Sequence, residues 1–323
     1  MSKNAANGIL MNSAGQNGKS KFRLLFRRLK REKELWLIAI PMIIWVGIFA
    51  YYPMYGVLMS FVDYMPGKEI FSSHWVGFKW FIEFFTSPDF GIIMRNTLVI
   101  SGLNLLIGFP APIILAILFN ELGNRYFKKI VQSISYLPYF ISWVVAASLL
   151  YSFLGNDGIL NDMLLRLGIL NTPISYLGEG KYFWTIITAA NIWKGIGWST
   201  IIYLSAIAGI DEELYQAGAV DGLGRFGAIW HIILPGIRPT IVLLWILGIG
   251  GILNAGFEQQ LLIGNAQTRE FWDVIDTYAY RFGVQLGRYS YGTAVGLMKS
   301  VIGLGLVLLT NKISKKAMGL SII

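Results

Sequence analysis

Long apolar segments constrain this chain more than any other feature of its sequence. A helix needs about 20 largely apolar residues to cross the hydrocarbon core of a bilayer. No water reaches that core, so each backbone polar group must be bonded within its own segment, as it is in a helix. We expect spanning helices at residues 36–61, 92–119, 131–154, 183–207, 239–262 and 291–310. The sequence therefore predicts an all-α, polytopic membrane protein with six transmembrane helices.

The composition agrees with a membrane location. Hydrophobic residues make up 55% of the 323-residue chain and charged residues only 14%, whereas about a quarter of a soluble domain is charged. The apolar segments are continuous rather than alternating, which argues against a transmembrane β-barrel. The net charge is +9, which in a soluble protein would suggest binding to nucleic acid. Here the basic residues cluster beside the apolar segments, where such residues set topology.

Basic residues also indicate which ends of the helices face the cytoplasm, because Lys and Arg are enriched in cytoplasmic segments. They cluster in the N-terminal tail, the second connection and the C-terminal tail: Lys21, Arg23, Arg27, Arg28, Lys30, Arg31 and Lys33, then Arg125, Lys128 and Lys129, and finally Lys312, Lys315 and Lys316. With six crossings, all three segments fall on one side. We therefore expect a multi-pass protein of the cell membrane, with both termini in the cytoplasm.

Three regions are expected along the chain. Residues 1–34 form a basic cytoplasmic tail, which is either a helix lying on the anionic inner leaflet or a solvated segment. Residues 35–312 form the six-helix transmembrane domain. Residues 313–323 form a short cytoplasmic C-terminal tail.

The connection between the fourth and fifth apolar segments, residues 209–236, is too long for a simple turn. Its sequence predicts two short helices. Asp211 can cap the first helix, and Gly222 and Gly224 can supply a bend after it. Pro235 is expected to end the second helix before the next crossing.

Small residues in the first of these short helices leave room for another surface to approach. They are Ala217, Gly218 and Ala219, and the preceding Glu212 and Glu213 suit the positive N-terminal end of a helix. The loop is therefore either a docking element for a cytoplasmic partner or an ordinary helix that re-enters the membrane surface.

The spacing of residues in this loop resembles the EAA motif of type I ABC importer permeases. In that family Glu-Ala-Ala is followed after three residues by Gly, and after nine more by Ile-x-Leu-Pro. The corresponding residues of this chain, with the Asp that often precedes Gly in sugar permeases, are Gln216, Ala217, Gly218, Asp221, Gly222, Ile232, Leu234 and Pro235. Gln216 stands in place of Glu and Gly218 in place of Ala, while the spacing is kept.

Other segments resemble the MalF-like carbohydrate permeases of the LplB type. These segments are residues 232–240, 256–259, 274–278 and 294–300, and the resemblance extends from about residue 33 to the end of the chain. The resemblance implies a MetI-like fold and a permease subunit of an ATP-driven oligosaccharide importer. Acidic, polysaccharide-derived oligosaccharides are one candidate class of substrate.

The resemblance also implies the partners of the chain. They would be a second, homologous permease subunit, two copies of a cytoplasmic ABC ATPase and an extracytoplasmic solute-binding protein. The ATPase would bind ATP and Mg²⁺, so this chain itself is expected to bind no cofactor and to catalyse no reaction. The loop at residues 209–236 would transmit the movement of the ATPase to the membrane helices.

Polar side chains at membrane depth are costly and often mark a transport pathway, and aromatic rings can stack on the C–H faces of sugars. The candidate pathway residues are Asn191, Trp193, Lys194, Trp198, Asn254, Phe257, Glu258, Gln259 and Lys299. Other roles are open, since Trp also forms interfacial belts and polar residues also bond helix to helix. Either lysine could pair with Glu258, and two cations in apolar helices favour a sugar that carries carboxylates.

Several kinds of site are missing from the sequence. The chain has no cysteine, and its two histidines, His74 and His231, lie too far apart for a metal motif. It also lacks the Gly-x-x-x-x-Gly-Lys-[Ser/Thr] phosphate loop. Two other classes remain: a secondary transporter driven by an ion gradient, which would not need the long loop, and a membrane enzyme, which should carry clustered acidic or histidine side chains.

Overall fold

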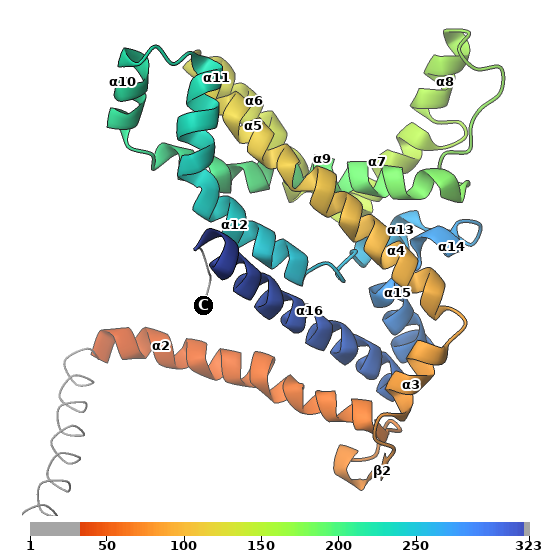
Figure 1. Ribbon diagram of the computed structural model, residues 1–323. Coiled ribbons are helices and arrows are strands. Elements are labelled where there is room, and N and C mark those ends of the chain that lie inside the picture. The colour runs from red at the N-terminus through yellow and green to blue at the C-terminus, as the bar shows by residue number, and fades with distance from the viewer. Residues whose placement is uncertain (1–32, 320–323) are drawn as a thin grey trace, which may run out of the picture. The chain divides into compact units, whose positions relative to one another are not determined.

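The computed structural model describes residues 33–319 and is almost entirely helical (Figure 1). The strands of this part of the chain are β1 (Val62–Asp63) and β2 (His74–Trp75), which pair antiparallel. The chain divides into two compact units at Leu58 and Met59. The expected interfacial helix of the N-terminal tail lies outside the described residues.

The described part of the first unit is one long helical segment. α2 (Lys33–Val46) continues as the π-helical turn η1 (Gly47–Tyr51) and then as η2 (Tyr52–Phe61), which extends into the second unit. No residue of α2 is buried, and its exposed side chains are almost all apolar. A helix that is apolar all round is typical of a membrane span.

The second unit contains all the other helices. In chain order they are η3 (Ile70–Ser72), α3 (Lys79–Thr86), α4 (Phe90–Leu103), η4 (Asn104–Gly108), α5 (Pro110–Glu121), α6 (Arg125–Phe140), α7 (Trp143–Leu154), α8 (Ile159–Arg166), α9 (Gly180–Ala208), α10 (Glu212–Val220), α11 (Arg225–Ala228), η5 (Ile229–Ile233), α12 (Leu234–Gly250), α13 (Glu258–Ile263), α14 (Arg269–Trp272), α15 (Ile275–Tyr280), η6 (Arg281–Gln285) and α16 (Tyr289–Met318).

Five helical segments of the described chain are long and apolar enough to cross a membrane. They are Lys33–Phe61, Phe90–Glu121, Trp143–Arg166, Arg225–Gly250 and Tyr289–Lys316. The expectation of six is therefore not exact. The missing one is the fourth expected segment, which forms the 29-residue helix α9. α9 is long enough to span, but polar residues such as Asn191 and Lys194 lower its mean hydropathy.

Two expected segments have different boundaries in the structure. The third, residues 131–154, is broken, because α6 ends at Phe140 and Ser142 accepts a hydrogen bond from the Val145 N–H (3.3 Å) as the cap of α7. The fifth, residues 239–262, ends early, since α12 stops at Gly250. Ser and Gly explain both breaks, because Ser offers the backbone a local hydrogen bond and Gly tolerates the bend.

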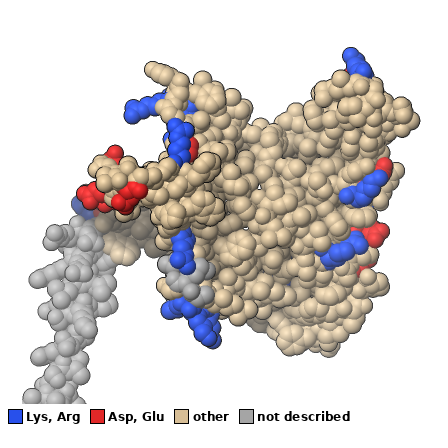
Figure 2. All heavy atoms as spheres, turned by 45° about the horizontal axis from the view of Figure 1, so that its top comes forward, with Lys and Arg blue, Asp and Glu red and all other residues tan. Residues whose placement is uncertain are grey.

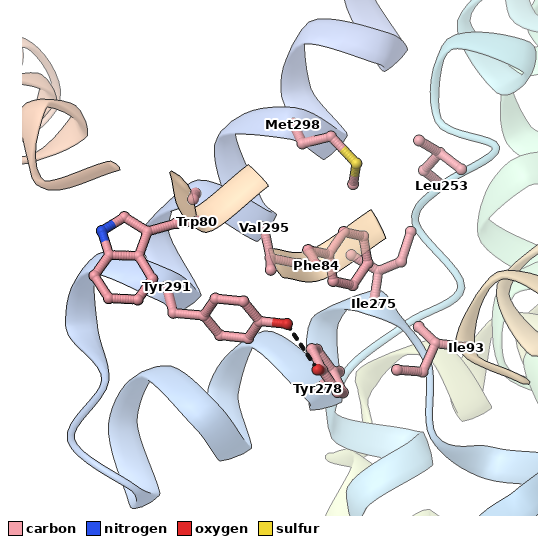
Figure 3. Close-up of a cluster of buried hydrophobic side chains, with 10 residues drawn as sticks. Trp80, Phe84, Ile93, Leu253, Ile275, Tyr278, Tyr291, Val295 and Met298 are labelled. Carbon is pink, nitrogen blue, oxygen red and sulfur yellow. Dashed lines mark hydrogen bonds between the residues drawn. The ribbon is translucent and has the colours of Figure 1, made fainter. Parts of the chain in front are cut away.

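Three clusters of buried apolar side chains hold the second unit together. One joins α3, α4, α15 and α16 and includes Trp80, Phe84, Tyr278 and Tyr291 (Figure 3). In this cluster the hydroxyls of Tyr278 and Tyr291 form a hydrogen bond of 2.8 Å. The second joins α4, α7, α9 and the region of α13 to α15. The third joins α5, α9, η5 and α12 and lies next to the expected coupling loop.

α6 crosses α9 at very close range. The crossing point is Gly197, where an added Cβ would lie 2.0 Å from the carbonyl oxygen of Ser135. Gly195, one half-turn earlier on α9, has no atom within 4 Å of the corresponding position. The backbone contact between the two helices therefore requires Gly at 197 but not at 195, as expected for helix pairs that approach through small residues.

We expect Gly197→Ala to lower the melting temperature of the purified protein, because overpacking at a tight contact costs about 1–3 kcal/mol. Gly195→Ala is the matched control. It should leave the melting temperature unchanged or raise it slightly, since Ala in a helix is favoured over Gly by roughly 1 kcal/mol. Tryptophan fluorescence during heating in detergent measures both, and equal melting temperatures for the two variants would show that the close crossing does not contribute to stability.

Candidate functional site

The connection at residues 209–236 forms the two helices and the bend that its sequence predicts. Asp211 caps α10, accepting a hydrogen bond from the Glu213 N–H (3.0 Å). After α10 the chain turns at Gly222, whose φ of +74° lies in the left-handed region that only Gly adopts without strain. The second helix then begins at Arg225. We call residues 209–236 the coupling loop, after the role that the sequence resemblance implies for it.

The second helix of the coupling loop does not end at Pro235, contrary to expectation. It passes from α11 through the π-helical turn η5 into α12, and Pro235 lies in the first turn of α12. The Leu234 N–H still donates to the Ile229 carbonyl within the π-helical turn, and Pro235, which has no N–H to donate, follows where the hydrogen-bond pattern changes from π to α. Figure 1 shows α11 and α12 as one helical path with a bend. The second helix of the loop is therefore continuous with a membrane span.

Gly218 packs inside the coupling loop rather than facing outward. It is buried, and an added Cβ would lie 2.9 Å from Leu223 Cδ1 and 3.0 Å from Ile232 Cδ1. Its carbonyl also accepts a hydrogen bond from the Leu223 N–H (2.8 Å). The expectation that Gly218 leaves room for a partner is therefore wrong, although its neighbours Ala217 and Ala219 are exposed.

The outer surface of the coupling loop is apolar, with acidic residues at one end. Val220, Phe226 and Trp230 are 88%, 80% and 67% exposed. The acidic Glu212 and Glu213 at the start of α10 are also exposed. Figure 2 shows acidic side chains grouped at the left of the face that comes forward from the top of Figure 1. Exposed aromatic residues in a group are typical of a surface that binds another protein.

The base of the coupling loop is attached to the end of α5. Arg225 lies 4.0 Å from the carboxylate of Glu121, the last residue of α5. Tyr215 of α10 packs against the buried cluster of α5, α9 and α12. Its pKa is raised, first by burial and second by the negative charge of Glu121. The loop is thus held to α5 by packing and charge, and to α12 by continuous helix.

A cavity of about 360 Å³ lies beyond this attachment, between α4 and α5, α9 and α12. Polar residues from three directions line it: Ser101, Asn104, Asn191, Ser199 and Asn254. Asn191, Gly195 and Ser199 follow one another at i, i+4 and i+8, so one face of α9 forms a wall of the cavity. Of the nine candidate pathway residues, Asn191 and Asn254 line this cavity.

Two further candidates, Gln259 and Phe257, lie at the start of α13, and Gln259 contacts Asn191. The Gln259 side chain donates a hydrogen bond of 3.4 Å to the Asn191 side chain. Phe257 precedes it and packs edge-on against Tyr280, with ring centroids 5.1 Å apart. Both residues belong to the start of α13 and not to the fifth span, where the sequence had suggested them.

The two candidate tryptophans of α9, Trp193 and Trp198, face away from this cavity. Trp193 lines a separate, apolar cavity of about 630 Å³ between α7 and α9. Trp198 stacks on Tyr139 of α6, with ring centroids 4.6 Å apart and planes 7° from parallel. In this conformation neither ring is available as a platform for a sugar in the polar cavity.

Both lysines have partners within the chain, and neither partner is Glu258. Lys194 donates a hydrogen bond of 2.9 Å to the carbonyl of Tyr139, near the end of α6 where carbonyls lack helical partners. Lys299 forms an ion pair with Asp276 of α15. Glu258 is exposed. The suggested pairs of Glu258 with Lys194 or Lys299 are therefore absent from the described part of the chain.

Sequence reasoning missed three polar residues of the cavity: Ser101, Asn104 and Ser199. Ser199 follows Asn191 at i+8, a signal that was available in the sequence. Ser101 is 7% exposed, and no hydrogen bond of its hydroxyl is found in the structure. Ser and Asn residues are common where helices pack together. Only the tertiary structure shows which of them line the cavity.

Known proteins share this arrangement. Residues 108–318 match the family of binding-protein-dependent transport system inner membrane components. This chain belongs to that family. The matched region includes the coupling loop, of which α11 is a part. It also includes α5, α9 and α12, which line the cavity. The expected type I ABC importer permease fold is confirmed.

Individual relatives extend the match over almost the whole chain. Protein LplB of Bacillus subtilis strain 168 is 46% identical over 289 residues, which cover 89% of this chain and 90% of LplB. The polygalacturonan/rhamnogalacturonan transport system permease protein YteP of the same organism is 44% identical and covers 92% of each chain.

A solved structure gives the same fold. A bacterial ABC transporter involved in the import of the acidic polysaccharide alginate contains a chain that is 40% identical, with a TM-score of 0.82. The match covers 91% of this chain and 99% of that chain. Another structure of a bacterial alginate ABC transporter, in complex with a periplasmic protein bound to alginate pentasaccharide, matches with a TM-score of 0.83.

We expect Gly218→Leu to loosen the coupling loop, since the larger side chain would force Leu223 and Ile232 away from α10. Backbone amides of residues 212–233 should then exchange with deuterium faster than in the parent protein, because local contacts set the free energy of opening. Ala217→Leu, at an exposed neighbouring position, is the control and should leave the exchange unchanged. Equal exchange in both variants would contradict the packing role of Gly218.

Proposed function

We propose that this chain is a permease subunit of an ATP-driven importer for oligosaccharides. It would form half of the translocation pathway and couple to a cytoplasmic ATPase through the coupling loop. The observation that carries this proposal is the structure of the loop. It has an exposed apolar surface, continues into α12 and contacts α5. Both helices line the polar cavity through Pro112 and Leu244.

The geometry supports a mechanical form of coupling. A partner that moves the exposed surface around Phe226 and Trp230 also moves α12, because the helix is continuous, and α5, because Tyr215 and Arg225 attach to it. Relative movement of α5, α9 and α12 would open or close the cavity. Alternating access of this kind requires two states that the partners bind unequally.

Partner subunits follow from the same proposal. A homologous permease would supply the other half of the pathway, two copies of an ABC ATPase would bind ATP and Mg²⁺, and a solute-binding protein would deliver the sugar. The binding protein would act on the side opposite the coupling loop. With the coupling loop in the cytoplasm, both termini are also cytoplasmic if α9 crosses the membrane together with the five apolar segments.

Two observations favour acidic oligosaccharides as the substrate class. The names of two relatives refer to acidic polysaccharides, polygalacturonan and alginate. In this chain, Lys299 is only partly buried, with 17% of its side chain exposed, and its partner Asp276 is a carboxylate. A carboxylate of the sugar could replace Asp276 as the partner of Lys299, which a neutral sugar cannot do.

We expect Gly222→Asp to weaken ATPase docking strongly, because a side chain at φ +74° strains the turn and the added charge lies beside the docking surface. Gly224→Asp is the matched control: an added Cβ meets nothing within 4 Å at either position, but the φ of Gly224 is an ordinary −75°. An affinity pull-down from native membranes in mild detergent, with mass spectrometry of the bound chains, measures docking.

The parent chain and Gly224→Asp should bring down a second permease and an ATPase with a phosphate loop, and Gly222→Asp should lose most of the ATPase. If the parent chain comes down alone, the importer proposal loses its support. A secondary transporter driven by an ion gradient would then be the leading alternative, and uptake that survives ATP depletion would identify it.

We expect acidic oligosaccharides to stimulate ATP hydrolysis by the reconstituted transporter more than neutral ones, each delivered by its binding protein. Lys299→Gln should reduce this preference about tenfold, since a hydrogen bond to a charged group contributes roughly 1.5 kcal/mol or more. Asn191→Leu is the control, because it removes a neutral cavity group and should weaken both responses alike. Equal stimulation by both sugar classes in the parent protein would contradict an acidic substrate.

A further inference from the structure

The short helix α3 has two apolar faces, one buried in the protein and one exposed. One face is buried: Trp80 and Phe84 are 7% and 1% exposed and pack in the cluster with Tyr291 and Val295 (Figure 3). The other face is open: Phe78, at the cap of the helix, Ile82 and Phe85 are 67%, 62% and 50% exposed. These three residues lie at i, i+4 and i+7, so they form one continuous stripe.

Polar interactions fix the orientation of α3 and hence of this stripe. The Trp80 indole N–H donates a hydrogen bond of 2.9 Å to the carbonyl of Val62, in β1. Glu83 forms an ion pair of 2.5 Å with Arg288, at the start of α16. The buried face and these bonds hold one side of the helix against the protein, so the apolar stripe is directed outward.

The position of α3 along the chain sets its depth relative to the bilayer. α3 ends at Thr86, and the span Phe90–Glu121 begins only four residues later. Its buried face packs on Tyr291 and Val295, in the first two turns of the span that starts at Tyr289. At 1.5 Å per residue, these contacts lie within about 10 Å of the start of that span. α3 is therefore at the level where two spans leave the hydrocarbon core.

The far end of the span that follows α3 identifies the leaflet in which α3 lies. The span that starts at Phe90 ends at Glu121, which lies next to Arg225 of the coupling loop. α3 is at the other end of this span, so it lies on the side of the membrane opposite the coupling loop. Further exposed aromatic side chains, Phe71 and Trp75, occur in the segment just before α3.

We propose that α3 is an interfacial helix whose stripe of Phe78, Ile82 and Phe85 lies in the surface of the leaflet opposite the coupling loop, with lipid as its partner. An amphipathic helix with aromatic and aliphatic residues on one face and a polar rim buries that face at the boundary of headgroups and acyl chains. Because its other face packs on α16 and its end leads into α4, α3 would hold the ends of both spans at a constant depth.

The absence of cysteine allows a direct test by single-cysteine spin labelling. Labels at Ile82→Cys and Phe85→Cys report on the stripe, Leu98→Cys is a reference on an exposed position of a span, and Ala266→Cys is an aqueous reference in an exposed loop. The chain and its co-purifying subunits are reconstituted in lipid nanodiscs. Collision of each label with oxygen, which concentrates in lipid, is compared with collision with nickel ethylenediaminediacetate, which stays in water.

We expect labels at 82 and 85 to resemble the label at 98, with oxygen collisions exceeding those of the nickel complex, and the label at 266 to show the reverse. Labels at 82 and 85 that meet the nickel complex as often as the label at 266 would show a stripe exposed to water. Protection from both reagents, in nanodiscs or only after a binding protein is added, would show a protein partner. Either of these two results would overturn the proposal.

Discussion

The lack of water in the bilayer core is the constraint on which the rest of this structure depends, because every buried polar group must find a partner within the protein. Lys194 satisfies a carbonyl near the end of α6, and Lys299 pairs with Asp276. Asn104 donates a hydrogen bond of 2.9 Å to the carbonyl of Ile100, inside its own helix. Charged side chains in the spans therefore first serve the fold, and a ligand binds Lys194 or Lys299 only by replacing the partner that each has within the chain.

The coupling loop is continuous with α12, one of the helices that line the cavity. The loop has its own small core around Gly218, which makes it a compact body rather than a flexible connection. Its second helix continues into α12, and its base contacts α5 through Glu121 and Tyr215. Under the proposed function, a partner that moves this body would also displace two walls of the cavity.

Several site residues were predictable because their role is local. Asp211 caps α10 and Gly222 turns the chain, and both roles depend only on neighbouring backbone. Gly218 was misassigned because its neighbours Leu223 and Ile232 approach it only after the loop folds. The same holds for Trp193 and Trp198, which share a helix with Asn191 but face other neighbours. The spacing of Asn191 and Ser199 marks one polar side of α9, but whether that side meets a cavity depends on the helices packed against it.

The sequence by itself determined the membrane location, the helical class, the family and the two short helices of residues 209–236. Composition, segment length and motif spacing are properties of the chain, and the absence of water in the bilayer leaves few alternatives to helix. Only the tertiary structure decided where the spans break, which partners Lys194 and Lys299 take, and which polar residues share the cavity with Asn191. These depend on contacts between residues far apart in sequence, such as Lys194 with Tyr139, and their energies exist only once the helices have packed.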